Sequence, residues 1–279
     1  KLTCPSSSNT DLQHSLDNLL LWANTRQLTI NTNKCSVLGL HGRFPSSNNS
    51  YFLNTCPLTS SDPIRDLGIL INDNLSYKSH INSIVSKSLQ RVGILFRGFL
   101  CRDLHFLRKA FITYVRPLIE YNSILWSPNQ KKYIDLIEKV QRRFTKCIPY
   151  LHKLPYLDRL KTINLPSLEL RRLHFDLFYY YKILHNLTDI NPDNFFTYHN
   201  PLSSLRQNLP IVTTPLSSTS KYLSTLPFRS LSCWNFLPLT LRNQTSFISF
   251  KLTVESMDLS SFLYGSVYSD LINFTLLLQ

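Results

Sequence analysis

Residues 129–147 read NQKKYIDLIEKVQRRFTKC, and this stretch decides the fold expected for the middle of the chain. Apolar residues recur every three or four positions, which predicts an amphipathic helix with one buried stripe, formed by Ile134, Ile137, Val140 and Phe144. The cations fall largely outside that stripe and are Lys131, Lys132, Lys139, Arg142, Arg143 and Lys146. Asp135 with Lys139, and Glu138 with Arg142, have the spacing of favourable ion pairs on a helix surface.

The flanking segments show the same helical period. Residues 79–99 form a broad apolar stripe with cations outside it. Asp103 is placed to cap a second helix that runs to residue 118 and is interrupted by Pro117, whose ring kinks or ends a helix. The stretch 129–147 is the third helix, and Ser167 is placed to cap a fourth helix that ends near Leu184. We therefore expect a helical bundle in the middle of the chain.

This bundle carries the whole charge excess. The chain has 279 residues and a formal net charge of +13. Between Lys78 and Lys182 there are 20 Lys or Arg and 7 Asp or Glu, whereas the remaining residues hold ten of each sign. A segregated excess of this kind favours a polyanionic partner, with nucleic acid preferred over a merely solvated face.

The two ends of the chain have a different texture. Residues 9–24 predict a helix, and Leu28–Ile30 and Ser36–Leu40 predict strands. The run Leu67–Ile71 is short, apolar and β-branched, so the first third is mixed α and β. After residue 191, many Pro, Ser and Thr residues predict a loose connection with short extended pieces, although 228–250 regains apolar density.

Several function classes are excluded by composition. The six glycines form neither a dinucleotide-binding array nor a P-loop. The six cysteines include no C-x-x-C pair, and no apolar run reaches the length of a membrane span. We expect an intracellular protein with reduced thiols and no membrane partner, with the nuclear and cytoplasmic alternatives both open.

The sequence also lacks the common motifs of metal-dependent and nucleophilic catalysis. The chain has no Asp-Asp, Asp-Glu or Asp-x-Asp pair of the kind that holds two metal ions, and Asp62 and Asp66 are better explained as turn caps. There is no G-x-S-x-G motif. His174 and His185 share one predicted helix without a Cys or acidic ligand at zinc spacing, which favours histidines at the edge of a core.

Aromatic residues are the remaining candidates. Tyr179, Tyr180 and Tyr181 precede Lys182, and these rings or Trp126 could stack on bases. Core packing is the favoured interpretation for most of them, because they recur at helical spacing.

Several strings of the chain resemble non-LTR retrotransposon reverse transcriptases of the LINE or jockey-like type. The first runs from Leu12 to Leu38 and includes Trp22, Asn31 and the Lys34-Cys35 pair. Further strings follow in the order of that family, namely Asp66–Ile69, Asn74-Leu75, His80-Ile81, Arg116–Trp126, Ile137–Phe144, Phe228-Arg229, Trp234-Asn235, Leu237-Pro238, Ser246-Phe247 and Phe250-Lys251. The matches span roughly residues 11–251.

The resemblance implies an α+β chain cut from a right-hand polymerase just after its catalytic aspartates. Residues 1–78 would be a mixed α/β palm remnant in which 51–72 form a primer-grip-like hairpin. Residues 79–150 would be a mainly helical basic thumb, 151–190 a helical C-terminal region and 191–279 a loosely structured tail.

The same resemblance assigns roles to residues. Leu67, Gly68 and Ile69 would place the primer end. The backbone of an RNA template and a DNA primer would be contacted by Lys87, Arg91, Arg97, Lys139, Arg142, Arg143 and Lys146. The chain alone would hold no catalytic residue, metal, cofactor or small-molecule substrate, since Mg²⁺ would belong to the intact polymerase. Two alternatives stay open, a stand-alone basic helical module that binds RNA or DNA and a decayed product without function.

Overall fold

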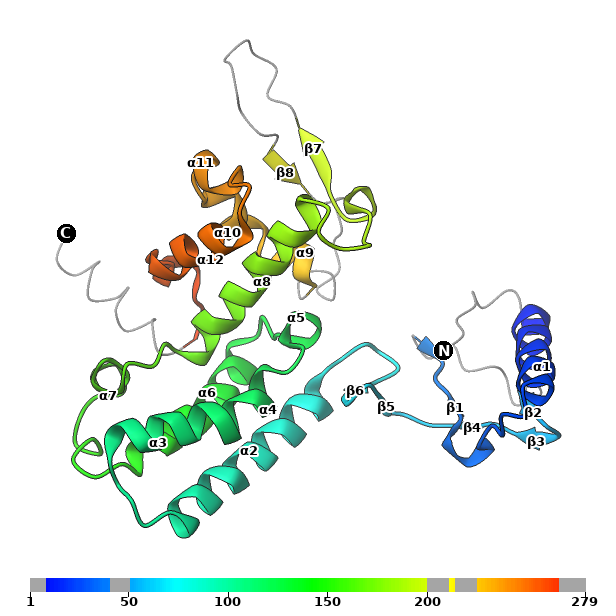
Figure 1. The fold of residues 1–279 in the computed structure, drawn as a ribbon, viewed down its shortest axis with the longest axis horizontal. Helices are drawn as coiled ribbons and strands as arrows, with labels where there is room; N and C mark the ends of the chain where they lie inside the picture. The colour runs from blue at the N-terminus through cyan, green and yellow to red at the C-terminus, as the bar shows by residue number, and fades with distance from the viewer. Residues whose placement is uncertain (1–8, 41–50, 200–210, 214–224, 266–279) are drawn as a thin grey trace. The chain divides into compact units, whose positions relative to one another are not determined.

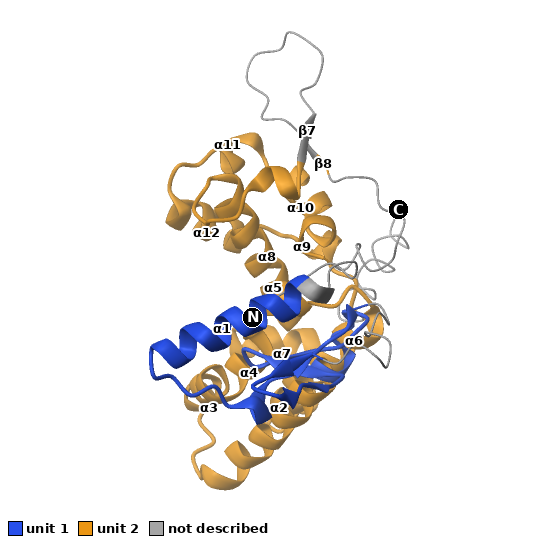
Figure 2. Cartoon of the chain, turned by 90° about the vertical axis from the view of Figure 1, so that its right-hand side faces the viewer, with its two compact units in different colours: residues 1–80 blue, residues 81–279 orange. Residues whose placement is uncertain are grey.

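The structure, a computed structural model, describes residues 9–40, 51–199, 211–213 and 225–265 (Figure 1). The chain divides into two compact units, residues 1–80 and 81–279 (Figure 2). Helices dominate and the strands are short, so the mixed α+β class is confirmed.

The first unit combines one long helix with short strand pairs. Its elements are α1 (Asn9–Thr25), η1 (Thr32–Lys34), β1 (Ser36–Val37), β2 (Phe52–Leu53), β3 (Cys56–Pro57), β4 (Thr59–Ser60), β5 (Ile64–Asp66) and β6 (Ile69–Ile71). β1 pairs with β4 in parallel, whereas β2–β3 and β5–β6 are antiparallel hairpins. The Gln13 side chain fixes α1 to β2, since its Nε2 donates to the Phe52 carbonyl at 3.0 Å and its Oε1 accepts from the Phe52 N–H at 2.9 Å.

The strand expected at Leu28–Ile30 does not form. α1 ends at Thr25, Gln27 takes a φ of 56°, and the Leu28 N–H donates to the Ala23 carbonyl at 2.8 Å. A left-handed residue that closes the last turn is a common helix ending. The backbone of Leu28 therefore completes the helix instead of pairing with a strand. The second expected strand, 36–40, is reduced to the two residues of β1.

The second unit is built almost entirely from helices. Its elements are α2 (Lys78–Gly98), which starts just before the division, α3 (Leu104–Ala110), the π-helical turn η3 (Phe111–Val115), α4 (Arg116–Glu120), α5 (Ser123–Trp126), α6 (Lys131–Lys146), α7 (Tyr156–Ile163), α8 (Leu168–Leu184), η4 (Pro192–Asn194), β7 (Thr197–His199), β8 (Ile211–Thr213), α9 (Leu226–Arg229), α10 (Leu231–Phe236), α11 (Leu239–Arg242), α12 (Phe247–Ser256) and η6 (Ser260–Phe262).

Three features of these helices follow the sequence closely. The Asp103 side chain accepts from the Phe106 N–H, and the Ser167 side chain accepts from the Leu170 N–H, so both expected caps are confirmed. Regular α-helix stops at Ala110 and resumes at Arg116 after the π-helical turn. Pro117 has no N–H to donate, so one backbone hydrogen bond of a regular helix cannot form there. The π-helical turn just before it accommodates this missing bond.

One hydrophobic cluster lies between α2, η3 and α6. The Phe144 ring of α6 stacks on Phe111 with centroids 4.4 Å apart, and its centroid lies 5.7 Å from that of Phe96 in α2. Ile137 and Val140 of the same helix face are completely buried. The apolar stripe predicted for residues 129–147 is therefore the face that α6 buries.

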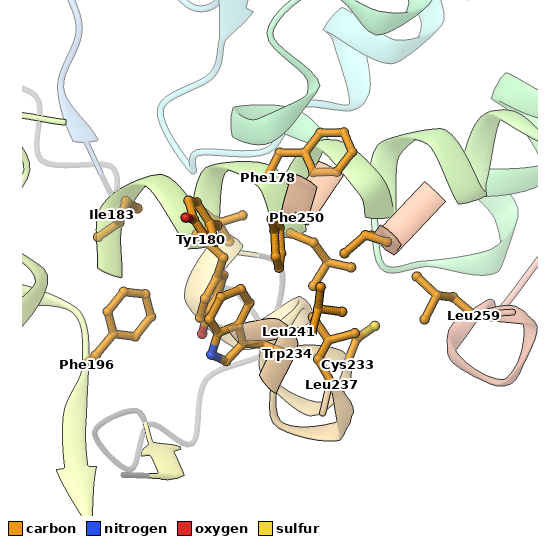
Figure 3. Close-up of a cluster of buried hydrophobic side chains, with 14 residues drawn as sticks. Phe178, Tyr180, Ile183, Phe196, Cys233, Trp234, Leu237, Leu241, Phe250 and Leu259 are labelled. Atoms are coloured by element: carbon orange, nitrogen blue, oxygen red, sulfur yellow. The ribbon is translucent and has the colours of Figure 1, made fainter. Parts of the chain in front are cut away.

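A second cluster surrounds α8 and the C-terminal helices (Figure 3). Tyr180 stacks on Trp234 with centroids 5.3 Å apart, and Tyr181 stacks on Phe250 at 4.4 Å. Stacked aromatic pairs of this kind add roughly 0.5–1.5 kcal/mol each beyond the area they bury. The cluster joins residues that are far apart in the chain.

The expectation of a loosely structured C-terminal region is wrong for residues 225–265. These residues form α9 to α12 and pack on α8. Each of α9, α10 and α11 has only four to six residues, which is too short to show a helical period in the sequence. Residues 200–210 and 214–224, where the loose connection was expected, lie outside the described residues.

Buried charged groups tie this segment to α8. Asp176, which is 2% exposed, accepts from Nε and a terminal nitrogen of Arg229 at 2.6 Å each. Glu169 accepts from the backbone N–H groups of Tyr264 at 2.7 Å and Gly265 at 3.0 Å. A Cβ at Gly265 would lie 2.5 Å from Oε2 of Glu169, so the backbone approaches the carboxylate as closely as it does only because this residue is glycine.

Candidate nucleic-acid interface

The outer face of α6 carries a row of cations. Lys139, Arg143 and Lys146, which we call the α6 cation stripe, follow one another at spacings of four and three residues and are all exposed. Such spacings place side chains on one side of a helix. The buried Phe144 and Ile137 lie on the other side. Lys132, seven residues before Lys139, is exposed on the same face and was missed as a site residue although its spacing matches.

The α6 cation stripe has no acidic neighbours in the sequence that follows. Residues 139–153 contain five Lys or Arg and no Asp or Glu. Within the described residues, no hydrogen bond or ion pair engages the side chains of Lys139, Arg143 or Lys146. These three charges are therefore available to an external anion.

Arg142 differs from the stripe. Its guanidinium is half-buried and lies over the Tyr156 ring, 5.0 Å from the centroid. A cation over an aromatic face is held by the ring quadrupole. This packing places Arg142 between α6 and α7, where it supports the helix pair as well as carrying charge.

The expected ion pair with Arg142 required Glu138 to lie on the helix surface, and Glu138 does not lie there. Its side chain is completely buried and accepts hydrogen bonds from the Tyr156 hydroxyl and from the Leu168 N–H, the latter at 3.0 Å. Burial raises the pKa of the Glu138 carboxyl, and the hydrogen bond from Tyr156 opposes that rise. Glu138 thus serves to join α6, α7 and the start of α8.

The cations of α2 lie elsewhere on the second unit. Lys87 is nine residues, or two and a half turns, from Phe96, which contacts α6. Lys87 therefore projects away from α6, and Arg97 is also exposed. Arg91 is exposed too, but one of its terminal nitrogens donates to the Tyr114 carbonyl at 2.9 Å. The helical spacing brings Lys139, Arg143 and Lys146 onto one face of α6, whereas Lys87, Arg91 and Arg97 lie on α2 and do not share one face of it.

The three residues expected at the primer end lie in the β5–β6 hairpin of the first unit. Asp66 pairs with Ile69, so Leu67 and Gly68 form a two-residue loop, and their φ values are 45° and 88°. Two central residues with positive φ are what a tight type I′ hairpin requires. Leu67 is 83% exposed at the tip, whereas Ile69 is 2% exposed and anchors the hairpin.

The aromatic candidates for base stacking are mostly interior. Tyr180 and Trp126 are buried, and their polar atoms donate to the carbonyls of Pro227 at 2.8 Å and Tyr121 at 2.9 Å. Tyr181 is also buried, and Tyr179 packs half-buried against the second cluster. The core interpretation is confirmed for the three buried rings.

The other polar candidates have structural roles. Asp62 accepts from the Asp73 N–H at 3.0 Å, which closes the base of the hairpin, as expected of a turn residue. His185 bonds the Arg242 carbonyl at 2.9 Å and stacks on Tyr181. Burial lowers the pKa of His174 to about 4. In the ranges that the structure describes, no group of three His, Cys, Asp or Glu side chains is placed to hold a metal ion.

Membrane insertion was not expected from the sequence. Within the described ranges, every helix is too short or too polar to cross a bilayer.

Comparison with known proteins adds one relative. The chain is 27% identical over 192 residues to uncharacterized protein B0403.1 of Caenorhabditis elegans, which covers 64% of this chain and 94% of that protein. No family model matches the chain. No solved structure matches it.

Proposed function

We propose that the α6 cation stripe binds the sugar-phosphate backbone of nucleic acid. The observation that carries the proposal is the row of three exposed cations, which make no ion pair within the described residues and stand opposite a fully buried helix face. Cations that neutralise phosphates release condensed counterions, and such contacts provide affinity with little sequence information. Binding is therefore non-specific and strongly dependent on salt.

We propose further that the chain is part of a retrotransposon reverse transcriptase. In this interpretation residues 79–150 correspond to the thumb, and the hairpin at Leu67 and Gly68 corresponds to the primer grip. What supports it is the sequence resemblance, together with an exposed hairpin tip and a basic helical unit in the same order along the chain. Ile69 would act by holding the hairpin, because its side chain is buried. The chain would grip and position template and primer, and catalysis with Mg²⁺ would belong to the intact polymerase.

A charge-reversal variant tests the binding proposal. The triple variant Lys139→Glu, Arg143→Glu, Lys146→Glu removes the α6 cation stripe, and its affinity for a short RNA–DNA hybrid is measured across a series of salt concentrations. The slope of log affinity against log salt is negative, and each lost phosphate contact makes it shallower by about 0.9, so three lost contacts should make it less negative by about 3. An unchanged slope would contradict the proposal.

A matched control separates this surface from net charge. Lys34, Lys109 and Lys161 are exposed on other elements, and no hydrogen bond or ion pair with described residues engages their side chains. Reversing these three charges changes the net charge by the same amount. If both triple variants lose affinity equally, the binding follows total charge and not the α6 cation stripe.

A second candidate is a stand-alone nucleic-acid-binding module, and the relative supports only its stand-alone character. The match covers 94% of the Caenorhabditis elegans protein, so that protein consists almost entirely of the matched region. The genomic reading frame upstream of Lys1 separates the two candidates. Continuation into an Asp-Asp box supports the polymerase fragment, and a start or stop codon there supports the module. In addition, templated primer extension by this chain alone would refute its proposed lack of catalysis.

A further inference from the structure

The turn that follows α6 displays one tyrosine to solvent. Tyr150 is 90% exposed and has a φ of 67°. Positive φ is unfavourable for a residue with a large side chain, and Gly or Asn is the usual occupant. Fold stability alone therefore does not explain a tyrosine at this position, because the ring is neither buried nor suited to the backbone.

The turn around Tyr150 is nevertheless well anchored. Ile148 and Leu151 are 2% and 6% exposed. The Leu151 N–H donates to the Ile148 carbonyl at 3.3 Å, and the Leu154 N–H donates to the Leu151 carbonyl at 3.0 Å. Buried side chains on both sides hold the backbone, so the Tyr150 ring is presented outward from a fixed position.

The exposed Tyr114 has a side-chain contact that Tyr150 lacks, because its ring lies 6.4 Å from that of Phe99. Within the described residues, the Tyr150 side chain has no hydrogen bond and no ring contact.

Charge around the turn is uniformly positive. Lys146, the last residue of the α6 cation stripe, precedes Tyr150 by four positions, and the exposed Lys153 follows it by three. The stripe spans about 10 Å of helix axis, at about 1.5 Å per residue. An exposed ring thus follows the row of cations along the chain, and aromatic rings beside a basic track are the combination that binds single-stranded nucleic acid.

We propose that Tyr150 stacks on an unpaired base of a single strand whose phosphates contact Lys139, Arg143 and Lys146. This inference rests on the binding function proposed above and names the form of nucleic acid preferred. A base face is free for stacking only where the base is unpaired, so a single strand or a single-stranded overhang should bind better than a blunt duplex of the same charge.

Substitutions at Tyr150 test the stacking. The probes are a labelled oligothymidine and a blunt duplex of equal length. Tyr150→Ala should weaken binding of the single strand by about 5-fold or more and leave binding of the duplex unchanged. Tyr150→Phe should keep wild-type affinity because the ring is retained. Tyr150→Asn suits the positive φ, so its loss of affinity cannot be attributed to misfolding.

Tyr264 provides a matched control, because it is 64% exposed and lies outside the basic turn. Tyr264→Ala should bind both probes as the wild type does. Equal loss of single-strand and duplex affinity in Tyr150→Ala, or no loss on either, would overturn the stacking. If the salt dependence becomes shallower in the α6 triple variant while Tyr150→Ala binds normally, only the stacking proposal is refuted. If the triple variant keeps its slope, the proposed function fails as well.

A spectroscopic readout reports the contact directly. Trp22 is 54% exposed, whereas Trp126 and Trp234 are buried. In the double variant Trp22→Phe, Tyr150→Trp, the introduced indole is the exposed one among the described tryptophans. Stacking on thymine should quench its fluorescence on addition of oligothymidine. Binding without quenching would show that the ring does not touch a base.

Discussion

Breaking the buried ion pair between Asp176 and Arg229 from one side should destabilise the second unit strongly. The two side chains are 3% and 8% exposed, and two 2.6 Å hydrogen bonds join them. Asp176→Leu leaves the guanidinium buried without its carboxylate partner, although its bond to the Ile124 carbonyl at 2.6 Å remains, and also removes the acceptor of the Ser230 hydroxyl. Breaking a buried pair from one side costs about 3–5 kcal/mol of unfolding free energy.

Urea unfolding followed by circular dichroism measures this cost. Removing both charges should be much less harmful, because an apolar pair of similar volume leaves neither Asp176 nor Arg229 buried without its partner. We expect the double variant Asp176→Leu, Arg229→Met to lie within about 2 kcal/mol of the wild type, with part of that loss due to the missing bond to Ile124. A single variant that costs under about 1 kcal/mol, or a double variant no better than the single one, refutes this reasoning. A wild type without a cooperative transition would instead favour the decayed-product alternative.

Two further predictions concern α8 and its contacts. Gly265→Ala should destabilise the protein by about 1–3 kcal/mol, because the new Cβ would force Glu169 away and break its bonds to the backbone N–H groups. The urea midpoint measures this loss. Ser261→Ala, at an exposed position nearby, should leave the midpoint unchanged. His174→Phe should remove a loss of stability on acidification. Burial holds the pKa of His174 at about 4, below its usual 6.5, so the stability it provides is complete above pH 6.5 and falls as the pH drops toward 4. The difference is worth up to about 3 kcal/mol, and parallel stability curves for the two proteins across that range would contradict it.

Helix positions in the middle of the chain could be predicted because each helix shows its own buried face. The stripe from Ile134 to Phe144 and the caps at Asp103 and Ser167 all appear as expected. The strand expected at Leu28–Ile30 failed because its first N–H closes α1. That bond depends on the φ of Gln27, which the local pattern of apolar residues does not report.

Residues that carried the resemblance prove to be mostly structural in the second unit. Ile137 and Glu138 are buried in α6, and Trp234 and Phe250 belong to the cluster on α8. Shared motifs of this kind describe a packed core. Of the exposed cations of α6 that support the proposed function, Lys139 and Arg143 lie inside one of these strings and Lys146 follows it, so this string also contributes to the surface.

The sequence by itself determined the helical period of the basic block, the location of the whole charge excess and the absence of common catalytic motifs. Only the tertiary structure decided that residues 225–265 fold onto α8, that Glu138 turns inward, and that the cations of α2 and α6 face different directions. The physical reason is that a periodic pattern reports which side of one helix is apolar. Which helices share a core depends instead on contacts such as Asp176–Arg229, which join residues 53 positions apart.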